Sequence, residues 1–262
     1  MNTLEIVKQY QGKLIPDLSY ATVRDFCDSA DHLSTIMRFD GDMKDVQRTW
    51  AIKAVLGKMP IGSKLLEIGA GEPIVANALH QLGYHVTIVD PYDGTGNGPT
   101  AYLAYVAKYP HVKIIKAYMQ ENTPGLTGNS LDCIYSVSVL EHVHPPKLDE
   151  LFAGIRKFLR PGGFSIHCID HVVGGNTAEL GEATARQVLS RQAKLQNPQL
   201  DEETLQQEID RTIKEYYQKM SSDVETYYHS AQGHNLWRGG RPYNEVPFCR
   251  IISTQTVAHK SV

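Results

Sequence analysis

Two glycines and two carboxylates are spaced in a way that suits the binding of an adenosine-containing cofactor. The segment "LLEIGAGEP" (65–73) places Glu67, Gly69 and Gly71 where an apolar run ends. Asp90 closes a second apolar run, "HVTIVD", 19 residues after Gly71. A glycine-rich turn after a buried strand lets backbone N–H groups approach a cofactor, and a carboxylate ending the next strand can accept hydrogen bonds from both ribose hydroxyls. Enzymes that use NAD and enzymes that use S-adenosylmethionine (SAM) share this arrangement.

The residues around this turn favour SAM over NAD. The dinucleotide fingerprint G-x-G-x-x-G/A needs a small third residue, and this chain has the β-branched Ile74 there. Glu72 would face a diphosphate unfavourably, because both groups are negatively charged. Glu67, in contrast, precedes the turn in E-x-G-x-G, from where an acid can orient the loop and serve the cationic end of an amino-acid cofactor. An NAD-dependent enzyme is the alternative, and it predicts NADH binding.

A second group of polar residues follows the fourth and fifth predicted strands. Asp170 and His171 are expected just after the fifth strand, on the cofactor's rim of the sheet, where a neutral histidine can take a proton from a hydroxyl. His142, in "LEHV", is the other candidate base. Each histidine is equally compatible with local packing or a surface loop. Together with His144 these residues show no tight metal-ligand spacing such as H-x-x-x-H among themselves, so we expect no metal.

Five short apolar runs, spaced by roughly 20 to 35 residues, predict the elements that position these groups. The runs are "KLLEIG" (64–69), "HVTIVD" (85–90), "VKIIKAY" (112–118), "LDCIYSVSVL" (131–140) and "GFSIHCID" (163–170). Largely apolar runs that do not alternate strictly are typical of parallel strands buried on both faces, with crossover helices between them. The fold class is therefore α/β, with a doubly wound, mostly parallel sheet.

The rest of the chain is interpreted as additions to this core. We expect an N-terminal helical segment over residues 1–60 and the α/β core over 61–175. Residues 176–246 form a helical and aromatic insertion that is far longer than the usual link between strands, so we expect a lid or a substrate platform. Its aromatic stretch contains two arginines, which suits a flat or anionic substrate. Residues 247–262 supply the final strand of the core and a tail.

Four segments between residues 60 and 172 occur in an order typical of one enzyme family. They are "LLEIGAGEP", "HVTIVDPY", "GNSLDCIYSVSVLEHV" and "FLRPGGFSIHCID". With them the chain resembles the class I SAM-dependent methyltransferases, and the resemblance implies their Rossmann-like fold with SAM as the cofactor. Pro73 stands where the family often has a third glycine.

The resemblance also implies where the cofactor binds. Asp90 would bind the ribose, and the backbone of the glycine turn would lie along the methionine part of SAM. Pro91, Met119 and Gln120 would contact the adenine, while Ser136 would line the methionine side. The full set of implied cofactor-binding residues is Glu67, Gly69, Ala70, Gly71, Asp90, Pro91, Met119, Gln120 and Ser136.

Composition limits the classes of partner. The 262 residues include 26 basic and 29 acidic side chains, and no run of Lys or Arg marks a nucleic-acid binder. The four cysteines are far apart, which argues against a disulfide scaffold or a zinc knuckle. No stretch approaches the roughly 18 apolar residues that a membrane span needs. We expect a cytoplasmic protein with a small-molecule substrate, no nucleic acid and no membrane partner, and the oligomeric state stays open.

These observations give one main hypothesis and several alternatives. The protein is expected to transfer a methyl group from SAM to a small-molecule acceptor, with oxygen preferred and with His171 or His142 as the base. Methylation of a nucleic-acid amine is disfavoured, because residues 136–139 read SVSV rather than [DNS]-P-P-[YFW]. A peptide or protein acceptor stays open. The alternative from another class is a non-catalytic SAM-binding module with a regulatory or assembly role.

Overall fold

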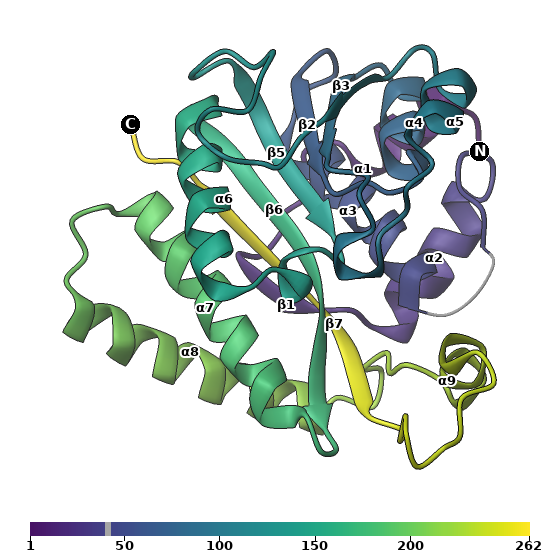
Figure 1. The fold of residues 1–262 in the computed structure, drawn as a ribbon, viewed down its shortest axis with the longest axis vertical. Helices are drawn as coiled ribbons and strands as arrows, with labels where there is room; N and C mark the ends of the chain where they lie inside the picture. The colour runs from purple at the N-terminus through teal and green to yellow at the C-terminus, as the bar shows by residue number, and fades with distance from the viewer. Residues whose placement is uncertain (40–42) are drawn as a thin grey trace.

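The strands form one mostly parallel sheet, as the sequence predicts. The computed structural model describes residues 1–39 and 43–262 (Figure 1). The strands are β1 (Leu18–Tyr20), β2 (Lys64–Ile68), β3 (His85–Asp90), β4 (Lys113–Lys116), β5 (Leu131–Val137), β6 (Leu159–Gly174) and β7 (Arg250–His259). In the described part of the chain they make a 7-stranded sheet with the order β1-β7-β6-β5-β2-β3-β4.

The order of the parallel strands reverses beside β2. From β2 the chain adds β3 and β4 on one side, and it then returns to add β5 and β6 on the other side. β7 is antiparallel to β6, and β1 is antiparallel to β7. In open α/β sheets such a reversal opens a crevice at the carboxyl ends of the strands, where ligands bind. A ligand site is therefore expected at the ends of β2, β3 and β5.

Helices cover both faces of the sheet. They are α1 (Thr3–Tyr10), α2 (Val23–Leu33), α3 (Met43–Lys58), α4 (Ile74–Gln81), α5 (Tyr102–Lys108), α6 (Pro145–Phe158), α7 (Ala178–Gln196), α8 (Glu202–Ser222) and α9 (Ala231–Arg238), with the short 3₁₀ helices η1 (Thr95–Asn97) and η2 (Leu140–His142). Buried side chains join α1, α3 and α4 to one face, and α6, α7 and α8 to the other (Figure 1). Among the described residues, no helix combines the length and the apolar character needed to cross a membrane.

Side chains along the central strands alternate between these two layers. In β2, Leu65 packs toward α3 and α4, whereas Leu66 packs toward α6. In β5, Tyr135 packs on the face covered by α3 and α4, and Ile134 packs on the face covered by α6. Successive side chains of a strand point to opposite faces, and burial on both faces explains why these strands read as nearly continuous apolar runs.

The predicted strands are all present, and two features at the antiparallel edge were not predicted. The five core strands correspond to β2–β6, and the predicted final strand is β7. The short strand β1 lies within residues 1–60, a segment expected to be only helical. β6 continues to Gly174 rather than ending at Asp170, because it remains paired with β7 beyond the end of β5.

The expected insertion, 176–246, contains α7, α8 and α9. Apolar side chains of α7 and α8 join the buried cluster on the α6 face, so these helices cover the sheet there. α8 begins after its N-cap residue Asp201, whose side chain accepts a hydrogen bond from the Thr204 N–H at 2.9 Å. A role of the insertion as a lid or a substrate platform stays a prediction.

Candidate active site

The turn after β2 brings backbone groups to the carboxyl edge of the sheet. Gly69 and Gly71 have φ angles of 64° and 56°, in the left-handed region that glycine adopts without steric cost. A Cβ atom on Gly69 would lie 2.7 Å from Cγ2 of Val139, so the turn packs directly against the segment after β5. Pro73 is the N-cap residue of α4, with φ −66°, a value that its ring prefers. Both glycines are therefore required by the backbone at this turn.

Asp90, the last residue of β3, ties this turn to the neighbouring strand. Its Oδ2 atom accepts a hydrogen bond from the Gly71 N–H at 3.0 Å, and its Oδ1 atom accepts one from the Tyr92 N–H at 2.8 Å. The Tyr92 hydroxyl donates to the Gly71 carbonyl at 2.9 Å. Burial raises the pKa of Asp90 above its ordinary value, and the two N–H donors oppose this shift. Each carboxylate oxygen keeps a lone pair that can accept a further hydrogen bond.

Glu67 lies behind the turn. Its side chain is buried and accepts hydrogen bonds from the Tyr135 hydroxyl, at 3.0 Å, and from the backbone N–H of Ala76 in α4. Burial raises the pKa of Glu67 to about 7. This position suits an acid that orients the loop and the start of α4.

A cavity of about 570 Å³ opens beside the turn, at the carboxyl ends of β2, β3 and β5. Its volume lies in the range usual for small-molecule sites. The predicted cofactor-binding residues that line it are Gly69, Asp90, Pro91, Met119 and Gln120. Ala70 and Gly71 belong to the adjoining turn, while Glu67 and Ser136 are buried outside the lining. The structure thus brings together most of the residues that the resemblance implied.

Other parts of the wall come from residues that sequence reasoning missed. Thr95 and Tyr118 line one side, with their hydroxyl oxygens 3.0 Å apart. Ser138 and the first turns of α6 line another side. No lining residue comes from 176–246, so among the described residues the insertion does not border this cavity. These wall residues are common polar types in loops, and only their positions after β3, β4 and β5 could have indicated them.

Ser136 does not reach the cavity. Its hydroxyl is buried and lies 2.8 Å from Nδ1 of His167, its partner across β5 and β6. The other ring nitrogen of His167 lies 2.7 Å from the Ser165 hydroxyl. Ser138, where the chain leaves the strand with a φ of 53°, lines the cavity instead.

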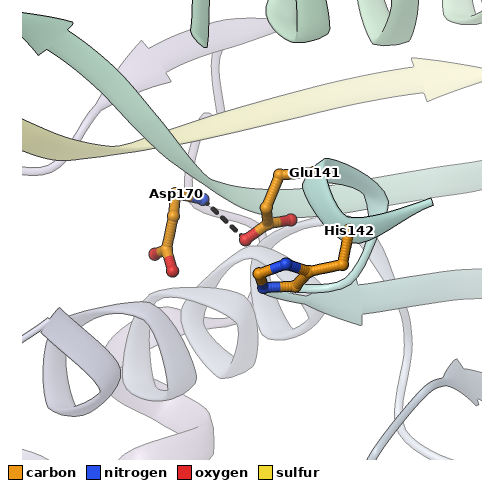
Figure 2. Close-up of side chains that lie close together, drawn as sticks. All are labelled: Glu141, His142 and Asp170. Carbon is orange, nitrogen blue, oxygen red and sulfur yellow. Dashed lines mark hydrogen bonds between the residues drawn. The ribbon is translucent and has the colours of Figure 1, made fainter. Parts of the chain in front are cut away.

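Three ionisable side chains gather where the segment after β5 meets the extended end of β6 (Figure 2). Glu141 and His142 belong to η2, and Asp170 belongs to β6. One nitrogen or oxygen atom from each lies within 4.8 Å of the others. Burial and the nearby Asp170 carboxylate raise the pKa of Glu141, and partial removal from water lowers the pKa of His142. The His142 ring also lines the cavity, as a candidate base must.

His171 is not part of this cluster, although it follows Asp170 in the chain. The expectation that it lies beyond the strand is wrong, because β6 continues past it. Adjacent strand residues point to opposite faces, and Asp170 faces α3 whereas His171 faces α8. The buried His171 ring lies 3.0 Å from Oγ1 of Thr254 and 2.8 Å from the Tyr217 hydroxyl, and burial lowers its pKa to about 4. The structure therefore does not bring His171 to the cavity.

Comparisons with known proteins bear on the same part of the chain. Residues 66–167 match the family model described as "Methyltransferase domain". No curated protein matches the chain. Among solved structures, the chain is similar to phosphoethanolamine N-methyltransferase 2 of Haemonchus contortus, with 22% identity, a TM-score of 0.48, and coverage of 92% of this chain and 61% of that one. It is also similar to a putative sarcosine dimethylglycine methyltransferase of Galdieria sulphuraria, with 15% identity, a TM-score of 0.44, and coverage of 82% and 85%.

The family match confirms the resemblance that the sequence motifs indicated. The matched residues 66–167 run from β2 into β6 and include the glycine turn and Asp90. The chain spans only about 61% of the length of the Haemonchus enzyme.

Proposed function

We propose that the protein is a SAM-dependent methyltransferase that acts on a small-molecule acceptor and methylates an oxygen atom. One observation carries the proposal: a single cavity is bordered by Gly69 and Asp90 on one side and by Ser138 and His142 on the other. Gly69 and Asp90 suit the adenosine and methionine parts of SAM. The second pair offers a hydroxyl and an imidazole to the acceptor.

The residues present suit SAM. Asp90 has lone pairs left for the two ribose hydroxyls after it has accepted its two backbone hydrogen bonds. The wall beyond it contains Pro91 and Met119, which offer an apolar surface to an adenine ring. Bound SAM would supply a methyl group on a cationic sulfur, so the electrophile is already activated. The protein then has to hold the acceptor in line with that methyl group and keep water away.

His142 is proposed as the base that accepts the proton of the acceptor hydroxyl. An imidazole with a lowered pKa is neutral near pH 7 and can accept a proton. As the new bond from oxygen to the methyl carbon forms, the bond from that carbon to sulfur breaks and releases S-adenosylhomocysteine, while the O–H bond breaks and its proton moves to a ring nitrogen of His142. An amine acceptor has little need of such a base, which is why a histidine at this wall favours oxygen.

The test measures S-adenosylhomocysteine released from SAM in the presence of a panel of hydroxylated and amine acceptors. We expect turnover with a hydroxylated compound, and a roughly 10²- to 10⁴-fold lower rate in His142→Ala, the range usual for losing a general base. His171→Ala is the matched control, because this ring lies outside the cavity, and its rate should match the wild type. Equal rates in His142→Ala and the wild type would remove His142 as the base.

The same panel separates the alternatives. If the protein binds S-adenosylhomocysteine but methylates none of the compounds, the non-catalytic module is the better description. If only peptides are methylated, the acceptor class is wrong while the cofactor assignment stands. NADH binding in place of SAM binding would support the dinucleotide enzyme.

A further inference from the structure

The cluster of Glu141, His142 and Asp170 contains two carboxylates whose negative charge the neighbouring cationic groups balance only in part. Figure 2 shows the three side chains around a common space, with a hydrogen bond from the Asp170 N–H to Oε1 of Glu141, 2.9 Å long. This bond occupies one Glu141 oxygen. The other, Oε2, is buried and accepts no hydrogen bond from any residue that the structure describes. A buried polar atom without a partner is costly, so Oε2 of Glu141 can accept a further partner.

The Asp170 carboxylate is held in place by neutral and cationic donors. Gln47 donates to Oδ1 at 2.6 Å, and Ser138 donates to Oδ2 at 3.0 Å. The Lys44 ammonium lies 3.8 Å from Oδ2, with 43% of its side chain exposed. Each Asp170 oxygen therefore keeps a lone pair. Two carboxylates this close repel each other, and a half-exposed lysine balances them only in part.

We infer that Glu141, His142 and Asp170 bind a divalent cation. The three atoms that would bind it already lie within 4.8 Å of one another. With metal–ligand bonds of 2.0–2.2 Å, neighbouring donors around a metal are about 3.0–3.5 Å apart, so side-chain rotations that bring the three atoms about 1–2 Å closer together would complete the site. Two carboxylates and one imidazole suit Mn²⁺, Fe²⁺ or Zn²⁺ better than a soft monovalent ion. Of the three residues, His142 lines the cavity, so the cluster adjoins the cavity on the His142 side.

The purpose of the cation rests on the proposed function, whereas its binding does not. A hydroxyl bound to a divalent cation loses its proton more readily than a free hydroxyl. With a cation bound, His142 would be a ligand in place of the base role proposed above: the cation would favour loss of the acceptor's proton to water as the O–H bond breaks, and the oxygen would then take the methyl group as the bond from sulfur to carbon breaks. The acceptor class would then be compounds with an oxygen that can bind a metal, such as a phenol or a vicinal diol.

The spacing of these residues did not predict a metal site, because two of the ligands are adjacent and the third lies 28 residues beyond His142. The expectation of no metal considered only regular short spacings. The crossing of η2 and the extended part of β6 brings the ligands together.

The test uses Mn²⁺ as the probe, because free Mn²⁺ has a strong electron paramagnetic resonance signal that diminishes on binding. The full-length protein is titrated with MnCl₂ in the absence of SAM. We expect one saturable site per chain. Glu141→Gln and His142→Ala should each weaken binding at least about tenfold, since even outer-shell changes cost 10- to 100-fold. His142 is exposed, so its replacement does not threaten the fold.

Two further variants make the result specific. Glu150→Gln is the matched control, because Glu150 also lines the cavity but pairs with Lys147 at 2.9 Å outside the cluster. It should bind Mn²⁺ like the wild type. Lys44→Gln removes the competing ammonium and should tighten binding by about two- to fivefold, as expected for a partly exposed charge pair.

The outcomes separate this inference from the proposed function. Absence of saturable Mn²⁺ binding, or equal binding in the wild type, Glu141→Gln and His142→Ala, overturns the metal site. S-adenosylhomocysteine titrations of the same samples report on the cofactor site alone. A protein that binds Mn²⁺ in this cluster but not S-adenosylhomocysteine would keep the metal site and lose the proposed function.

Discussion

Replacing Asp90 with asparagine tests the cofactor site most directly. Each Asp90 oxygen already accepts one backbone N–H, from Gly71 or Tyr92, and each is proposed to accept one ribose hydroxyl. An asparagine can place an oxygen on only one of these two sides. On the other side its NH₂ group would face a backbone N–H, where no hydrogen bond can form.

The expected loss follows from the strength of these bonds. A hydrogen bond to a charged group contributes about 1.5–3 kcal/mol, and the amide loses the charge as well as one acceptor. We expect Asp90→Asn to weaken the binding of S-adenosylhomocysteine by about 3 kcal/mol, which is a roughly hundredfold higher Kd. Isothermal titration calorimetry at pH 7.5 measures this difference, and thermal unfolding without ligand shows whether the variant is folded.

Asp132→Asn is the matched control. Asp132 accepts a hydrogen bond from the backbone of Lys64 and pairs with Arg160, at the opposite end of the parallel strands. The same chemical change there should leave the Kd for S-adenosylhomocysteine unaltered. A folded Asp90→Asn protein whose Kd stays within about threefold of the wild type would refute the role given to this carboxylate.

Three further predictions concern stability. The pKa of Glu67 is raised from its ordinary 4.5 to about 7, so between these pH values the folded state keeps a proton that the unfolded state releases. The free energy of unfolding should therefore fall by about 3 kcal/mol as the pH rises through this window. Urea unfolding at pH 5 and pH 8 measures this fall, and Glu67→Gln should remove it. The pKa of His171 is lowered from 6.5 to about 4, so as the pH drops the unfolded state takes up a proton before the folded state does. The free energy of unfolding should therefore fall between pH 6.5 and pH 4. His171→Asn should lessen this fall in acid unfolding curves. Gly69→Ala should lower the free energy of unfolding in urea by about 1–3 kcal/mol, because the new Cβ is strained in the left-handed region and also lies too close to Val139. The control Gly12→Ala, at a φ of 71° with no atom near its Cβ, should show the cost of the left-handed backbone alone. Equal losses in the two variants would contradict a close contact with Val139.

The central strands and one wall of the cavity could be predicted because their signals are local. An apolar run buried on both faces, a glycine turn and a carboxylate at a strand end are all visible within a few residues. Gly69 and Asp90 line the cavity as the motif indicated. The three-residue strand β1 left no such signal, because it is held by its pairing with β7 at the other end of the chain.

The polar cluster could not be predicted, since it depends on where β6 ends and which way each side chain points. A strand that stopped at Asp170 would have left both Asp170 and His171 on the rim. Four further residues of pairing with β7 instead send the two side chains to opposite faces. Gln47, which bonds to Asp170, lies 123 residues away in the sequence, and no periodicity connects the two.

The extended end of β6 has a consequence for how this protein could be altered. The cavity wall that carries Gly69, Asp90 and Met119 comes from the turns after β2, β3 and β4, whereas Asp170 and its partner Gln47 come from the overhang of β6 and from α3. If the proposed function holds, exchanging single side chains at Gln47 or in the overhang of β6 would alter the surroundings of the acceptor, while the hydrogen bonds of Asp90 to the glycine turn would be kept. Changes of acceptor would then need no new way of holding the methyl donor.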